Sequence, residues 1–161
     1  MIVSAAYGLA AIPTGRAQLS AAPGACSLLA KEAVEQALGT SVGEARMGAN
    51  NGTVTSCSFP IKGGGSISVL FRRNAERAWI AEQEQRMNRG VRYGSFRPVD
   101  GLGEQAFVLD LRAAGAALCV FRTDYYLQVS VFKAGDAAAV LPGMEKLVKA
   151  ALARVRYAPE R

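Results

Sequence analysis

Histidine, the residue that most often acts as a general base or a metal ligand, is absent from this chain of 161 residues. Ser-His-Asp and Cys-His catalysis are therefore excluded, as is zinc bound through histidine. Three cysteines are too few for a Cys₄ zinc site. The carboxylates form no acid–base dyad, because Glu82 and Glu84 diverge on a helix, and Glu32 and Glu35 near a helix start favour its dipole. The sequence predicts a protein that is not an enzyme and has no cofactor or metal.

Two glycine-rich segments, residues 62–66 and 101–103, have the composition of phosphate-binding loops. A phosphate loop leads directly into a helix, whereas each of these segments precedes a predicted strand. We interpret both as turns.

Arginines cluster between residues 72 and 97, and aromatic residues lie among them. This combination can bind anionic or planar partners. The competing interpretation is a solvated charged face, since glutamates intervene and Glu82 can pair with Arg86, and Trp79 is expected in the core. The candidate binding surface consists of Arg72, Arg73, Arg77, Arg86, Arg89, Arg92, Tyr93 and Arg97.

The net charge of +6 and the isoelectric point near 9.5 favour loose attraction to polyanions, but we do not expect specific binding of nucleic acid. Half of the residues are hydrophobic, which is enough for one globular core.

The N-terminus resembles the end of a signal peptide. Residues 1–12 are apolar and uncharged but too short to span a bilayer, and Gly15 and Ala17 suit cleavage after Ala17. The basic n-region is missing, which an upstream true start would explain; a buried N-terminal strand or helix is the alternative. Cys26 is not expected to carry lipid, because Pro23 occupies the position of a large apolar residue. We therefore expect a periplasmic or secreted protein without a transmembrane segment.

Apolar spacing predicts an α+β fold, an antiparallel sheet packed against two or three helices. Residues 1–25 are assigned to a signal-peptide remnant and linker, and residues 26–158 to a single domain. Helices are predicted at 30–38, 75–88 and 137–157, the last two capped by Asn74 and Asp136. Strands are predicted at 54–61, 66–71, 91–96, 105–111, 117–123 and 125–133, with a weaker candidate at 43–48.

A weak internal repeat supports this fold. The pattern Cys-x-Phe occurs at 57–59 and 119–121, and each copy precedes an alternating strand and then a capped helix, at an offset of 61–62 residues. The repeat predicts two αβββ half-repeats sharing one sheet. Chance is the competing explanation, because a β-hairpin followed by a helix is common.

The odd number of cysteines leaves at least one unpaired within the chain. In an exported chain a bridge between Cys26 and Cys57 would fix the first helix to the sheet. Pairing of Cys57 with Cys119, or three free thiols in a cytoplasmic protein, are the alternatives. Cys119 lies in an apolar strand and is expected to be buried and unreactive.

Four short motifs follow one another along the chain. Cys-x-Leu-Leu at 26–29 opens a helix that ends in Leu-Gly at 38–39, a cysteine precedes an aromatic residue at 57–59, and Gly-Leu-Gly-x-x-Ala lies at 101–106. This series, spanning residues 24–155, resembles uncharacterised secreted and lipoprotein domains of bacteria, a domain family of unknown function.

The resemblance implies an antiparallel sheet backed by helices, a Cys26–Cys57 disulfide and a location outside the cytoplasm, and it implies no activity. The chain departs from the family in lacking a polar helix cap at Ala30 and a clear lipid-attachment cysteine. We therefore expect a non-catalytic, exported accessory or binding domain whose partner is an unknown protein, glycan or lipid of the cell envelope. The alternative is a polyanion- or nucleic-acid-binding module that uses the basic region from Arg72 to Arg97.

Overall fold

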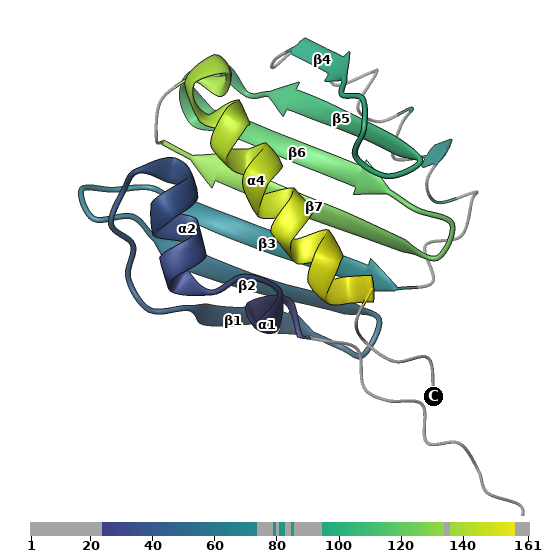
Figure 1. The fold of residues 1–161 in the computed structure, drawn as a ribbon, viewed down its shortest axis with the longest axis horizontal. Coiled ribbons are helices and arrows are strands. Elements are labelled where there is room, and N and C mark those ends of the chain that lie inside the picture. The colour runs from purple at the N-terminus through teal and green to yellow at the C-terminus, as the bar shows by residue number, and fades with distance from the viewer. Residues whose placement is uncertain are drawn as a thin grey trace, which may run out of the picture.

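The computed structural model describes residues 24–73, 79, 81–82, 85, 95–133 and 136–156. Its strands form one antiparallel sheet in the order β1-β2-β3-β7-β6-β5-β4, and α1, α2 and α4 all pack on one face of that sheet (Figure 1). The predicted α+β class is confirmed. The elements are α1 (Ala25–Leu28), α2 (Lys31–Leu38), β1 (Arg46–Asn50), β2 (Val54–Pro60), β3 (Ser66–Arg73), β4 (Ser95–Pro98), β5 (Gln105–Asp110), β6 (Gly115–Phe121), β7 (Tyr125–Phe132) and α4 (Ala137–Arg156).

The middle of the sheet follows the predicted alternation of apolar and polar residues. Buried and half-buried residues alternate along β2 and β3, and β3 pairs with β7 so that Val69 lies opposite Val129. The glycine-rich segments 62–66 and 101–103 lead into β3 and β5, so their interpretation as turns is confirmed. Gly63 and Gly103 have positive φ angles of 99° and 82°, which glycine adopts without steric cost.

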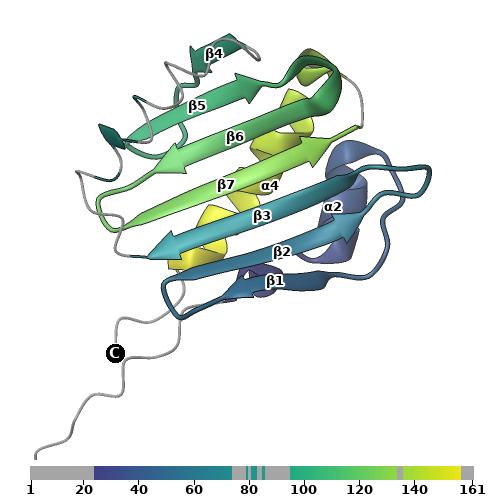
Figure 2. The same ribbon diagram turned by 180° about the vertical axis from the view of Figure 1, so that it is seen from behind.

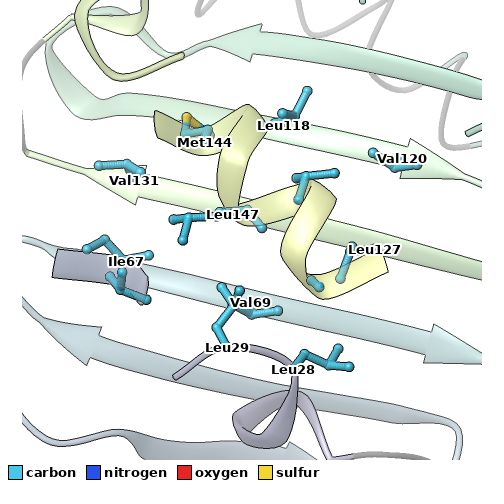
Figure 3. Packing of buried hydrophobic residues seen from close by; sticks show 14 of the residues in the cluster. Leu28, Leu29, Ile67, Val69, Leu118, Val120, Leu127, Val131, Met144 and Leu147 are labelled. Atoms are coloured by element: carbon cyan, nitrogen blue, oxygen red, sulfur yellow. The ribbon is translucent and has the colours of Figure 1, made fainter. Parts of the chain in front are cut away.

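The main hydrophobic core lies between the sheet and the helices. Met144 and Leu147 project from α4 toward Leu118 and Val131 of the sheet (Figure 3). The predicted cap of this helix is confirmed, because the carboxylate of Asp136 accepts a hydrogen bond from the Ala139 N–H at 2.8 Å. The core thus unites residues from both ends of the domain.

A disulfide joins Cys26 in α1 to Cys57 in β2, with 4.9 Å between the Cα atoms. It is the bridge that the resemblance implies, and it fixes the N-terminal helical turn to the sheet. Cys119 is a buried free thiol, as expected.

Some element boundaries differ from the predictions. The linker was expected to extend to Ala25, but Ala25 begins α1, a single helical turn too short to show helical periodicity. Beside it, Ala30 lies at the N-cap of α2 without a side-chain hydrogen bond. The strand predicted at 43–48 lies at Arg46–Asn50, where an irregular register with β2 weakens the alternation. Of the strand predicted at 91–96, residues 95 and 96 belong to β4 at Ser95–Pro98, and residues 91–94 lie outside the described residues, as does the signal-peptide region.

The internal repeat is visible in the strand order, but the two Cys-x-Phe motifs do not occupy equivalent positions. The order β1-β2-β3 is mirrored by β5-β6-β7 about the central β3–β7 pair. However, Cys57 belongs to the core beneath the helices, whereas Cys119 belongs to a cluster on the opposite face. The loop of the β2–β3 hairpin is one residue longer than the loop of the β6–β7 hairpin, because Pro60 pairs with Ser66 but Phe121 pairs with Tyr126. A shift of one residue reverses the face of every side chain, so the two Cys-x-Phe motifs are not equivalent.

Candidate binding face

The sheet has two chemically different faces. One face is covered by α1, α2 and α4. Figure 2 shows the opposite face, on which none of these three helices lies, and we call it the second face. Residues paired directly across antiparallel strands point to the same face, so the register defines its members. They are Arg46, Val54, Ser56, Ser58, Pro60, Ser66, Ser68, Leu70, Arg72, Pro98, Gln105, Phe107, Leu109, Ala117, Cys119, Phe121, Tyr126, Gln128, Ser130 and Phe132.

An aromatic cluster occupies one part of the second face. The ring of Tyr126 lies 4.9 Å from that of Phe121 and 5.3 Å from that of Trp79, the latter edge-on. Trp79, which was expected in the core, is half-buried and packs against this smaller buried cluster on the second face, not against the main core. Phe107 and Leu109 of β5 also pack against this cluster, while the main core takes Ala106 and Val108 from the same strand.

Arg72 is the predicted site residue with the most distinctive environment. Its guanidinium carbon lies 4.2 Å from the centre of the Trp79 ring, which is a cation–π contact. Its Nε is buried and, among the residues that the structure describes, has no hydrogen-bond partner. Arg72 therefore has a fixed position, and one of its donors is unsatisfied.

A chain of polar side chains crosses the middle of the second face. The Tyr126 hydroxyl contacts both the Cys119 sulfur, at 3.2 Å, and the Gln128 side-chain oxygen. The Gln128 amide in turn donates to the hydroxyl of Ser130 at 2.7 Å. Burial raises the pKa of the Cys119 thiol from 9.0 to about 11, and it also raises the pKa of Tyr126. Both groups are neutral at physiological pH, so neither is an activated nucleophile or base.

The raised pKa predicts slow alkylation of Cys119 in the native protein. At pH 8 a thiol with a pKa of about 11 is about 100-fold less ionised than one with a pKa of 9, and only the thiolate reacts. Labelling with iodoacetamide should therefore be at least about 100-fold slower in the folded than in the urea-unfolded protein, and should accelerate as the pH rises toward 11. Equal rates in the two states would show that Cys119 is accessible and ordinarily acidic.

Serine hydroxyls line the part of the second face formed by β2 and β3. Ser56 and Ser58 on β2, and Ser66 and Ser68 on β3, are half-buried and alternate with core residues. The Ser56 hydroxyl accepts a hydrogen bond from the Ala49 N–H at 2.7 Å. These serines were not among the predicted site residues, although their spacing of two within predicted strands was a usable signal.

The predicted basic surface is not assembled by the arginines that the structure describes. Arg73 pairs with Tyr125, a residue of the main core, and therefore points to the face opposite Arg72. Arg97 is exposed on the edge strand β4 and pairs with Val108, so it also belongs to the helix-covered side. The other members, Arg77, Arg86, Arg89, Arg92 and Tyr93, lie outside the described residues.

Within the described ranges, no helix is long and apolar enough to cross a membrane. No cluster of three or more acidic, cysteine or histidine side chains suited to a metal ion occurs in that same part of the chain. No protein-family model matches the chain, and neither a curated protein nor a solved structure matches it significantly.

Proposed function

We propose that this protein is a non-catalytic binding domain that functions outside the cytoplasm and contacts its partner through the second face of its sheet. The observation that carries the proposal is the one-sided arrangement of α1, α2 and α4. They bury one face. On the other, Ser68, Arg72, Trp79 and Gln128 stay half-buried, whereas Cys119, Phe121, Tyr126 and Ser130 are buried. Sheet faces with this mixture of aromatic, hydroxyl and amide groups suit binding better than packing against a core.

The disulfide supports a location outside the cytoplasm. Disulfides persist in oxidising compartments and are rare where thiols are kept reduced. The bridge between Cys26 and Cys57 agrees with the signal-peptide character of the N-terminal sequence. We therefore propose an exported protein of the periplasm or the extracellular space.

The chemistry of the second face supports binding rather than catalysis. The chain has no histidine that could activate the serines of this face, and Cys119 and Tyr126 are buried there with raised pKa values. Donors and acceptors remain, which can recognise a partner without reacting with it.

A bulky residue in the middle of the second face should prevent binding. Ser68 lies between Ser58 and Ser130 on the neighbouring strands, and a strand tolerates tryptophan well, so Ser68→Trp is expected to fold. The exposed Lys149 of α4, changed to Trp, is the matched control. Pull-down assays with peptidoglycan sacculi, polygalacturonate, dextran and vesicles containing phosphatidylglycerol would compare both variants with the wild type.

We expect Ser68→Trp to weaken binding to the polymer or vesicle that the wild type retains by at least tenfold, and Lys149→Trp to change it less than twofold. Both variants should keep the unfolding midpoint of the wild type within a few degrees. Loss of binding in the α4 variant, with full binding in the Ser68 variant, would contradict the proposal and move the binding surface to the helices.

A further inference from the structure

The charged strand residues that point to the second face all have the same sign. Arg46 shares the face of its partner Ser58, and Arg72 that of Tyr126. No aspartate or glutamate occurs among the second-face residues defined above, while Asp110 pairs with Ala116 and therefore points to the helix-covered side. The described strands thus present positive charge and no carboxylate on this face, which favours an anionic ligand.

Arg72 is prepared to bind an anion. Among the described residues its guanidinium makes no hydrogen bond and no ion pair, and its buried Nε is an unsatisfied donor. Because this Nε is closed to solvent, a ligand on the surface would reach Arg72 only through its two Nη groups. Stacking on Trp79 fixes the plane of the guanidinium and leaves its edge for a bidentate contact, which carboxylates match.

The neighbouring side chains point to a ligand rich in hydroxyl groups. Ser56, Ser68 and Gln128 both donate and accept hydrogen bonds, as sugar hydroxyls do. The backbone groups of β3 and β7 are already paired on both sides in the sheet. A peptide that adds as a strand requires an unpaired sheet edge, so it would not use this face.

Two other anionic partners fit less well. A membrane surface would need exposed apolar side chains, and among the described residues the exposed large hydrophobic side chain is Met47, on the edge strand β1. Nucleic acid is bound through contacts with several phosphates, whereas the described second face offers only Arg46 and Arg72.

Building on the function proposed above, we propose that the partner is a polysaccharide carrying carboxylate groups, such as a polyuronate. Arg72 binds its carboxylate, and the serine and glutamine side chains of the second face bind its hydroxyls. Arg72 is then the residue that determines specificity for the acidic polymer over a neutral one.

The test compares oligogalacturonate with its methyl ester, which has the same sugar backbone without the charge. Isothermal titration in about 50 mM salt would measure both ligands against the wild type, Arg72→Gln, Arg72→Lys and the control Arg97→Gln, which removes an equal charge from the helix-covered side. We expect the wild type to prefer the acid by at least tenfold. Arg72→Gln should abolish that preference, Arg72→Lys should retain part of it, and Arg97→Gln should change affinity less than twofold.

The possible failures separate the two proposals. If the wild type bound acid and ester with equal affinity and Ser68→Trp bound neither, the proposal of an anionic ligand would be wrong. The proposal that the second face binds the partner would stand. Acid binding that Ser68→Trp leaves intact would overturn the binding face itself. The proposal of a polyuronate ligand would be overturned if the wild type bound neither sugar. It would also be overturned if Arg72-dependent binding occurred only with DNA or only with anionic vesicles. Because Arg72→Gln removes the contact with Trp79, unfolding midpoints and the Arg72→Lys variant distinguish lost recognition from lost folding.

Discussion

Replacement of Cys26 and Cys57 by alanine is expected to lower the free energy of unfolding by roughly 3–4 kcal/mol. The disulfide closes a loop with a sequence separation of 31 residues, and removing such a cross-link restores conformational entropy to the unfolded chain. The loss is large against the 5–15 kcal/mol that about 160 residues typically provide. Urea unfolding followed by circular dichroism measures it.

Reductant provides the matching control for this experiment. Dithiothreitol should destabilise the wild type by a similar amount and leave the Cys26→Ala/Cys57→Ala variant unchanged, because Cys119 is already a free thiol. If the urea midpoint of the wild type does not move on reduction, the bridge does not constrain the unfolded chain.

Truncation of Leu118 should destabilise the protein by about 3 kcal/mol, whereas truncation of Leu70 should cost less than about 1.5 kcal/mol. Leu118 is fully buried between the sheet and α4, so Leu118→Ala leaves a cavity that the surroundings fill only in part. Leu70 is half-buried on the second face, where solvent can replace the lost methyl groups.

The two leucine variants test the difference between the faces with identical chemistry. Their urea midpoints should separate clearly from each other while the denaturant slopes stay equal. Similar losses at both positions would mean that the second face is packed as tightly as the core, which leaves no room for a partner.

The sequence allowed the middle of the sheet and the last helix to be predicted because their patterns are long and regular. In β7, Leu127, Val129 and Val131 alternate with polar residues, and all three lie in the main core. In α4, Met144 and Leu147 belong to a stripe with helical spacing, and both are buried. The disulfide was implied by the resemblance, while the residues alone left other pairings open.

Other features depend on contacts that no local pattern contains. The single turn α1 is too short for periodicity, and Ala25 and Leu28 are buried because the disulfide and the core hold that turn in place. Alternation in β3 sends the neighbouring arginines Arg72 and Arg73 to opposite faces, so their proximity in sequence did not predict a shared surface. The role of Trp79 likewise depends on its position over Arg72, which is known only from the fold.

Chemical-shift mapping tests the central claim most directly, because it locates the contact on the folded protein without any substitution. Titration of isotopically labelled protein with trigalacturonate should shift the resonances of Ser68, Arg72 and Gln128, while the exposed side of α4, including Lys149, stays unchanged. Shifts confined to α2 and α4 would contradict the account and show that the helices, not the second face of the sheet, bind the partner.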